Sequence, residues 1–224
     1  MVKEECQMRG RKRGALPLAA VLTVMLIGVQ SPVQAAGGSD PRFLEGISAP
    51  EPGYTEISTA EELYQIRDNT SGYYVLTQDI DLSGYENWSP VRDFSGVLDG
   101  QGHVIRNLTI TKLGNSAYPY AGLFGVVDGG TIRNLGLEDV DIAMDYAYGS
   151  YIGAIAGKLS GESAIENCYS TGSIYADAMS RYNNDIFCGG GLAGWAGETG
   201  QSLIRSSYSR TTLTATGRYG SILG

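Results

Sequence analysis

Histidine, cysteine and tryptophan are scarce in this chain of 224 residues, which contains one His, three Cys and two Trp. The zinc-protease motif H-E-x-x-H needs two histidines, so a chain whose single histidine is His103 cannot contain it. A Ser-His-Asp triad would also have to use His103, and no G-x-S-x-G sequence supports a nucleophilic serine. These absences exclude a zinc-peptidase centre, argue against a serine hydrolase, and leave us expecting no metal and no cofactor.

Three short patterns imitate binding or catalytic motifs without completing them. The stretch DIDLSG (79–84) starts like a calcium-binding EF-hand loop, but its twelfth position holds Pro90 instead of glutamate, which leaves a solvated strand end as the expectation. The stretch CGGGLAG (188–194) matches the dinucleotide-binding motif G-x-G-x-x-G. It is not followed by a helical pattern or by an acidic residue about twenty positions later, which argues against a cofactor loop. The acids of GLEDVDI (136–142) lack acidic counterparts in the repeats after them, whereas a glycosidase needs paired carboxylates.

The first 35 residues have the organisation of a Sec-type signal peptide. Five basic residues precede the apolar run ALPLAAVLTVMLIGV (15–29), and VQA (33–35) supplies small residues at positions −3 and −1 of a cleavage site. The apolar run is short for a membrane span, which needs about 20 residues, so an uncleaved anchor is the less favoured alternative. We therefore predict export without membrane insertion, with residues 36–53, rich in Gly, Pro and Ser, as a linker.

Removal of the signal peptide makes the remaining chain more acidic. Residues 1–35 carry five basic and two acidic residues, so the formal charge of the rest is −8 − 3 = −11. An acidic surface repels nucleic acid and anionic lipid, and neither is an expected partner. Of the cysteines that remain, Cys168 falls at an inward repeat position and Cys188 at the edge of an insert. This favours one buried thiol and one half-exposed thiol, and a disulfide between them is the alternative that export permits.

Residues 54–93 are predicted to form an N-terminal cap of one helix and one or two strands. Thr59 and Glu62 make a capping box, and Leu63 and Ile66 lie on one face of a helix over residues 60–67. The stretch GYYVLTQDIDL (72–82) follows, with buried strand positions predicted at Tyr74, Leu76 and Ile80.

From residue 94 onwards helical periodicity disappears and two blocks recur in phase. The blocks AGLFG, GAIAG, GGLAG and GSILG end at glycines 125, 157, 194 and 224, and the blocks VIRNLTI, TIRNLGL, AIENCYS and LIRSSYS place isoleucines at 105, 132, 165 and 204. One such unit cannot bury its own apolar face, whereas stacked units can. Residues 94–224 are therefore predicted to form an all-β fold, a parallel β-solenoid in which each strand pairs with its equivalent in the next repeat.

The alignment of the repeats also predicts which side chains face the interior. The predicted core positions are Leu98, Ile105, Leu108, Ile110, Leu123, Ile132, Leu135, Leu137, Ile155, Ile165, Leu192 and Ile204. Asn107, Asn134 and Asn167 recur at one position and are expected to hydrogen-bond along the axis as a ladder that ends at Ser206.

These blocks together resemble a known repeat family. The stretches SGVLDGQGHVIRNLTI, GTIRNLGLEDVDI, AIENCYSTGSI and GGLAG are similar to the GLUG-motif repeats of bacterial surface proteins, and ISTAEELYQIRDNTSGYYVLTQDIDLSG to the cap that often precedes them. The repeats also resemble a region of immunoglobulin A1 metallopeptidases, without their active site. The resemblance covers about residues 54–224 and implies a right-handed parallel β-helix in a secreted or cell-surface protein.

Inserts fall at one phase of every repeat, over residues 111–120, 143–150 and 175–185, so stacking is expected to gather them on one side. Exposed tyrosines next to amide and carboxylate groups suit contact with a sugar or a protein. The candidate ligand-binding residues are Tyr118, Tyr120, Tyr146, Tyr148, Tyr175, Tyr182, Asp145 and Asn183, with Asn184 beside them.

The sequence thus predicts a non-enzymatic secreted or surface-exposed module for adhesion or ligand binding, whose partner is a glycan or a host or surface protein. Two alternatives remain: an exported polysaccharide lyase or hydrolase on the same fold, and a passive stalk of a larger surface protein. The segment YGSILG (219–224) starts a further repeat, so we also expect additional repeats or domains in a longer chain.

Overall fold

The computed structural model describes residues 53–112, 119–145, 150–178, 188–197, 200–217 and 221–222. The predicted signal peptide and nearly all of the predicted linker lie outside these residues. Within them, none of the helices has the length and apolar character needed to cross a membrane. The fold is all-β except for the short helix α1 (Ala60–Gln65) and one 3-10 turn (Ile66–Asp68), and its sheets are parallel.

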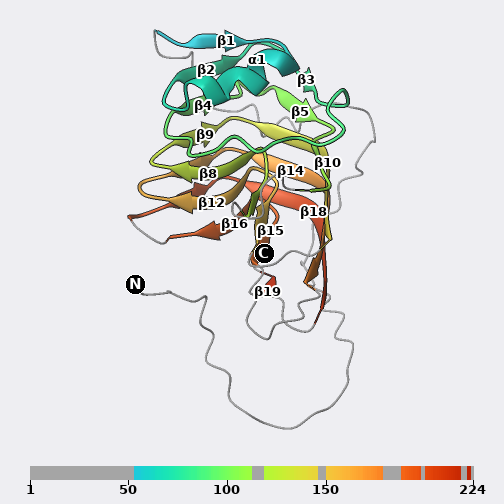
Figure 1. Cartoon of the computed structure of the whole chain (residues 1–224). Coiled ribbons are helices and arrows are strands. Elements are labelled where there is room, and N and C mark those ends of the chain that lie inside the picture. The colour runs from blue at the N-terminus through green and yellow to red at the C-terminus, as the bar shows by residue number, and fades with distance from the viewer. Residues whose placement is uncertain are drawn as a thin grey trace, which may run out of the picture. The chain divides into compact units, whose positions relative to one another are not determined.

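From Val97 onwards the described chain passes through four parallel sheets in turn, and each complete pass, here called a layer, adds a strand to each sheet (Figure 1). The first sheet has the order β1 (Thr55–Ile57), β2 (Tyr73–Leu76), β4 (Val97–Asp99), β9 (Thr131–Arg133), β13 (Ala164–Glu166) and β17 (Leu203–Arg205). The second has the order β3 (Ile80–Asp81), β5 (Val104–Arg106), β10 (Gly136–Asp145), β14 (Tyr169–Ala178) and β18 (Tyr208–Gly217), with β6 (Thr109–Ile110) also paired to β10. The third contains β7 (Tyr120–Ala121), β11 (Tyr151–Gly153), β15 (Cys188–Gly190) and β19 (Ser221–Ile222), and the fourth β8 (Phe124–Asp128), β12 (Ala156–Ser160) and β16 (Ala193–Ala196).

Aliphatic side chains stack in columns between the sheets and form the core. Leu98 pairs with Ile132, which pairs with Ile165, and all three are fully buried. Ten of the twelve predicted core positions are likewise buried, but Leu192 is only partly buried and Ile204 is 42% exposed. Ile204 lies on β17, the last strand of the first sheet among the described residues, so only one side of it is covered by a neighbouring layer.

The predicted alignment of the first repeat is wrong. Ile105 pairs with Leu137 in the second sheet, and Leu98 is the partner of Ile132 in the first. The reason is that the first layer reaches the second sheet through a longer corner, over residues 100–103, where the next layer needs only residues 134–135. The similar blocks therefore start in different sheets: VIRNLTI starts in the second sheet, and TIRNLGL starts in the first and enters the second at Gly136.

This shift removes one member from the predicted asparagine ladder. Asn134 and Asn167 occupy equivalent corners with φ of 53° and 49°, and the amide of Asn167 donates to Oδ1 of Asn134 at 2.9 Å. Ser206 takes the same left-handed conformation in the next layer, with φ of 51°. Asn107 lies at a later corner and donates to Asp81 instead. The ladder exists, but it starts at Asp99, which accepts from the amide of Asn134 at 2.9 Å.

Glycine allows neighbouring layers to approach closely. A Cβ added to Gly153 would lie 2.5 Å from the carbonyl oxygen of Ala156 and 2.6 Å from Cα of Ala193 in the next layer. Gly194, the last glycine of CGGGLAG, would likewise meet the backbone of Ile152. The glycines of this stretch serve the stacking of strands, as the repeat pattern predicts.

The N-terminal cap has the predicted helix and strands, and it also supplies β1, which the sequence did not predict. The capping box of Thr59 and Glu62 is present, and Leu63 and Ile66 are both buried. Tyr74, Leu76 and Ile80 are buried as predicted. Because β1 and β2 join the first sheet and β3 joins the second, the cap continues the sheets of the repeats.

Candidate functional site

The strands that enter and leave the predicted inserts are stacked in register. On entry, β10 pairs with β14 as far as Asp145, and β14 pairs with β18 as far as Ala178. On leaving, Tyr120, Tyr151 and Cys188 pair in successive layers. Both ends of the inserts therefore lie on the same side of the stack. The predicted bounds are wrong at two of them, because residues 143–145 and 175–178 belong to the strands β10 and β14.

Most of the predicted ligand-binding side chains lie outside the described residues. These are Tyr118, Tyr146, Tyr148, Tyr182, Asn183, Asn184 and the side chain of Asp145. Tyr120 and Tyr175 are described, and they lie in different sheets. The structure therefore does not bring these two tyrosines together in one strand row.

Tyr120 belongs to an aromatic stack in the third sheet. Its ring centroid lies 5.4 Å from that of Tyr151 with an interplanar angle of 25°, and Tyr151 makes an edge contact with Trp195 at 6.1 Å. Burial, together with the charge of Asp93, raises the pKa of Tyr120. Stacking covers the facing sides of Tyr120 and Tyr151, so these ring faces are not available to a ligand.

Tyr175 has a different environment, on the outward face of the second sheet. Its neighbours in the same row are Ala143 on β10 and Thr214 on β18, neither of which is aromatic. The hydroxyl of Tyr175 lies 3.3 Å from Oγ1 of Thr216, which is on the next strand and two residues further along. This diagonal reach means that the ring lies across the sheet instead of standing upright from it.

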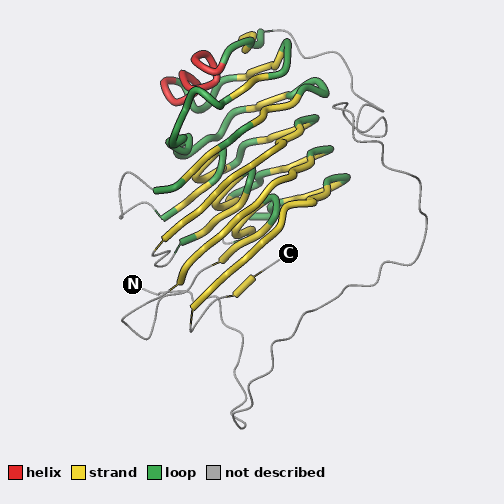
Figure 2. Tube along the Cα trace, turned by 90° about the vertical axis from the view of Figure 1, so that its right-hand side faces the viewer, coloured by secondary structure: helices red, strands yellow, loops and turns green. Residues whose placement is uncertain are grey.

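Polar side chains surround Tyr175 on the flat face made by β10, β14 and β18. Figure 2 shows these long strands running side by side. We call this surface the Tyr175 face; its other members are Asp141, Ser173, Thr212, Thr214 and Thr216, which are exposed, and Asp177, which is partly buried. Alternation along the strands directs Ile174, Ala176 and Leu213 towards the core and these residues towards solvent.

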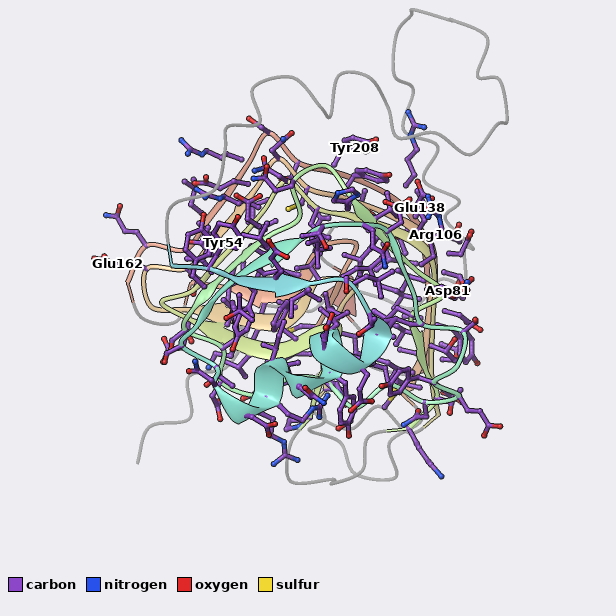
Figure 3. The ribbon with its side chains drawn as sticks, turned by 90° about the horizontal axis from the view of Figure 1, so that it is seen from above. Tyr54, Asp81, Arg106, Glu138, Glu162 and Tyr208 are labelled. Carbon is purple, nitrogen blue, oxygen red and sulfur yellow. The ribbon has the colours of Figure 1, made fainter. Side chains whose placement is uncertain are left out.

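A column of charged groups borders the second sheet, and the sequence analysis missed it. Arg106 donates to Asp79 at 2.8 Å and to Glu138 at 3.0 Å, and Glu138 accepts a hydrogen bond from the hydroxyl of Tyr169 at 2.7 Å. Tyr169 in turn stacks on Tyr208 at 5.4 Å. Figure 3 shows Arg106, Glu138 and Tyr208 on the same side. The correct register places opposite charges in adjacent layers, and this signal was hidden by the misaligned first repeat.

The hydrogen bonds of this column control its protonation. Partial burial opposes ionisation of Asp79, but donors from Arg106, the backbone of Val104 and His103 hold the pKa of this carboxyl below its usual value. Burial and the hydrogen bond to Glu138 raise the pKa of Tyr169. Asp81 accepts from Asn107 and from the backbone of Ser83, which lower its pKa. Asp79 is thus exposed at a strand end, as expected, and it also forms an ion pair with Arg106.

A second ion pair lies at the corner between the first two sheets. Asp99 is 1% exposed, and its carboxylate accepts from Nε of Arg133 at 2.8 Å as well as from Asn134. Arg133 also donates to the hydroxyl of Tyr73 at 2.6 Å. A buried carboxylate needs such partners, so this pair fixes the corner at which the asparagine ladder begins.

Both cysteines outside the predicted signal peptide are free and buried. Cys168 is inward-facing as predicted, and burial raises the pKa of its thiol to about 12. The predicted half-exposure of Cys188 is wrong, because this residue is 0% exposed. Cys188 is the first residue of β15 and stands in register with Tyr151.

Within the described residues, no three His, Cys, Asp or Glu side chains come together as a group that could hold a metal ion. The described carboxylates of Asp79, Asp99 and Glu138 are engaged by arginine. The Tyr175 face is a polar sheet surface with one aromatic ring lying across it. Such a surface is suited to contact with a ligand.

Comparison with known proteins gives three similarities. Residues 54–172, just over half of the chain, match the family model described as M26 IgA1-specific metallo-endopeptidase N-terminal region. Halomucin from Haloquadratum walsbyi is 31% identical over 175 residues, which are 69% of this chain and 2% of halomucin. The crystal structure of a candidate immunoglobulin A1 protease from Bacteroides ovatus is 21% identical, with a TM-score of 0.42 and coverage of 75% of this chain and 74% of that one.

The chain thus spans only 2% of the length of halomucin. The resemblance to immunoglobulin A1 metallopeptidases, inferred above from the repeats, is confirmed by the family model, and membership of the GLUG-motif family stays a prediction. On the match over residues 54–172, the chain belongs to the M26 IgA1-specific metallo-endopeptidase N-terminal region family.

Proposed function

We propose that this protein is an exported, non-catalytic ligand-binding module built on a right-handed parallel β-helix. The parallel pairing of successive layers supports the helix, and the right hand follows the rule that connections between parallel strands of one sheet are right-handed in about 98% of cases. The signal-peptide pattern of residues 1–35 supports export to the cell surface or the surroundings.

The family description names an endopeptidase, but the proposal for this chain is binding. With His103 as the only histidine, the chain cannot supply the H-E-x-x-H pattern of a zinc peptidase. The ionised groups near His103 are paired with one another: Asp79 lies 3.2 Å from its Nδ1 and 2.8 Å from Arg106. These contacts join residues of neighbouring layers, which is the structural role that the proposal gives them.

The observation that carries the proposal is the Tyr175 face. Three strands hold it, and the register of β14 with β18 runs without interruption over ten residue pairs. Tyrosine presents a large amphipathic surface at a small cost in conformational entropy, and a rigid sheet holds it in place before the ligand arrives. The proposal therefore assigns ligand contact to this face and to the inserts that follow its strands.

Binding of the purified exported chain to a printed array of glycans and to surface and host proteins tests this function. Tyr175→Ala is expected to weaken the strongest interaction, and Tyr54→Ala is the matched control because Tyr54 is 37% exposed in the cap, away from this face. Cleavage of a polysaccharide by the wild-type chain would favour the enzyme alternative. Absence of any ligand across both collections would favour the passive stalk.

A further inference from the structure

We infer that the ligand of the Tyr175 face is an extended, uncharged carbohydrate chain, with one sugar ring stacked on Tyr175. This inference rests on the proposed binding function and names the class of ligand. Four features of the described residues lead to it: the orientation of the ring, the flatness of its surroundings, the chemistry of its neighbours and their charge.

Within the part of the chain that the structure describes, no other aromatic ring stacks on Tyr175. The contact of its hydroxyl with Oγ1 of Thr216 at 3.3 Å draws the ring along and across the sheet, so that one face lies towards the strands, and the side chain is partly buried. Other described tyrosines stack in pairs, with Tyr120 on Tyr151 and Tyr169 on Tyr208, both at 5.4 Å. An apolar sugar face packs on an open aromatic face, whereas in those pairs the rings cover each other.

The surroundings of the ring are flat. A flat surface suits an extended oligosaccharide, whereas a terminal sugar that is bound end-on needs a pocket. Ala143 and Thr214, the neighbours of Tyr175 in its row, are too small to rise above the ring. Ser173 and Asp177 lie two residues to either side on the same strand, so the three positions span about 13 Å. That distance exceeds one sugar ring, and a longer oligosaccharide would meet more of this face than a single sugar.

The polar groups around the ring match the hydroxyls of a sugar. Ser173, Thr212 and Thr214 carry exposed hydroxyls, which both donate and accept hydrogen bonds, and the carboxylates of Asp141 and Asp177 accept them. Hydrogen bonds with a charged acceptor are stronger than neutral ones, so the two aspartates favour ligands rich in hydroxyl donors. An apolar peptide would offer no hydrogen-bond donors to these hydroxyls and carboxylates.

Charge decides between neutral and acidic carbohydrates. The two aspartates flank Tyr175, and the described cation nearest along β18 is Arg210, which lies over the ring of Tyr208 with its guanidinium carbon 5.4 Å from the ring centroid. The remainder of the chain after the predicted signal peptide has a formal charge of −11, from −8 for the whole and +3 for residues 1–35. The two aspartates and the negative net charge would both repel uronic and sialic acids.

Calorimetric titration of the purified chain with a neutral trisaccharide of β-1,4-linked N-acetylglucosamine, its monosaccharide and a trigalacturonate tests the inference. We expect the trisaccharide to bind more tightly than the monosaccharide and at least about tenfold more tightly than the trigalacturonate. Tyr175→Ala should weaken the trisaccharide about tenfold, Tyr175→Phe less than about threefold because the ring remains, and Tyr54→Ala should leave affinity unchanged. Asp141→Asn with Asp177→Asn should reduce the discrimination against trigalacturonate.

Two results would overturn the inference while leaving the proposed function intact: tighter binding of the acidic sugar, or binding of a protein with no binding of the neutral trisaccharide. Trisaccharide binding that Tyr175→Ala leaves unchanged would also overturn it, because the carbohydrate would then lie elsewhere. Circular dichroism and the thermal midpoint of each variant show whether it has folded. If the folded wild-type chain binds neither carbohydrate nor protein, the proposed function fails together with the inference.

Discussion

The column that contains Ile132, Ile165 and Ile204 allows the effect of burial on stability to be measured with the same substitution at two positions. Ile165 is paired on both sides and 0% exposed, whereas Ile204 is paired on one side and 42% exposed. Ile165→Ala removes a fully buried side chain and leaves a closed cavity, and such truncations cost about 2–5 kcal/mol. The two variants thus change the same residue type in the same column, with only the covering layer different.

For Ile204→Ala the expected loss is about 1 kcal/mol. Full burial of an isoleucine side chain stabilises by about 1.5–3 kcal/mol, and about three-fifths of Ile204 is removed from solvent. No closed cavity forms, because its outer side is open to solvent in the described structure. Leu203→Ala is a useful companion, since Leu203 is 44% exposed on the same strand.

Urea denaturation followed by tryptophan fluorescence and circular dichroism measures both losses, with Trp88 as a fully buried reporter. The expected result is a free energy of unfolding lowered at least twice as much by Ile165→Ala as by Ile204→Ala. Equal losses would refute the reasoning, because Ile204 would then be covered in solution by something outside the described layers. Sedimentation at several concentrations would show whether that cover is a second copy of the chain.

Three further predictions concern close contacts, thiols and acid stability. Gly153→Ala should lower the thermal midpoint by several degrees, because its Cβ would meet backbone of its own and the next layer, while Gly84→Ala, with nothing within 4 Å, should change it little. Cys168 and Cys188 should react slowly with a thiol reagent in the native state and fully in 6 M guanidinium; fast labelling of either in the native chain would contradict its burial. Because the pKa of Asp79 is lowered by folding, its ionised form stabilises the protein above about pH 4 and this contribution is lost as the pH falls through the lowered value. The urea midpoints of wild type and Asp79→Asn should therefore converge below about pH 4, and a constant difference down to pH 2 would exclude this role.

The sequence by itself determined the class of fold and much of the core. Repeats that cannot bury their apolar faces alone must stack, so the spacing of glycine and isoleucine predicts parallel layers. Local signals were equally informative in the cap, where the capping box of Thr59 and Glu62 fixes the start of α1. The capping box depends on residues near one another in the chain, and the repeats recur along it, which is why a single sequence reveals both.

The tertiary structure decided the register between layers and everything that follows from it. The pattern I-R-N occurs at residues 105–107 and 132–134, at two different corners, and each ends with an asparagine in the left-handed conformation. Sequence similarity could not distinguish these corners, since both satisfy the same local requirement. The hydrogen bonds between whole strands distinguish the two corners, and the resulting register pairs Arg106 with Glu138 in the next layer.

The environment of each candidate side chain was likewise a property of the neighbouring layers. The sequence placed Tyr120 and Tyr175 in one class of exposed tyrosines, and it placed Cys188 at an exposed edge. In the neighbouring layers, Tyr151 stacks on Tyr120, whereas Ala143 and Thr214 are the neighbours of Tyr175. Cys188 lies in a fully buried strand. Residues about 30 to 40 positions away in the chain determine whether a ring is covered or open, and only the stacked structure brings them into contact.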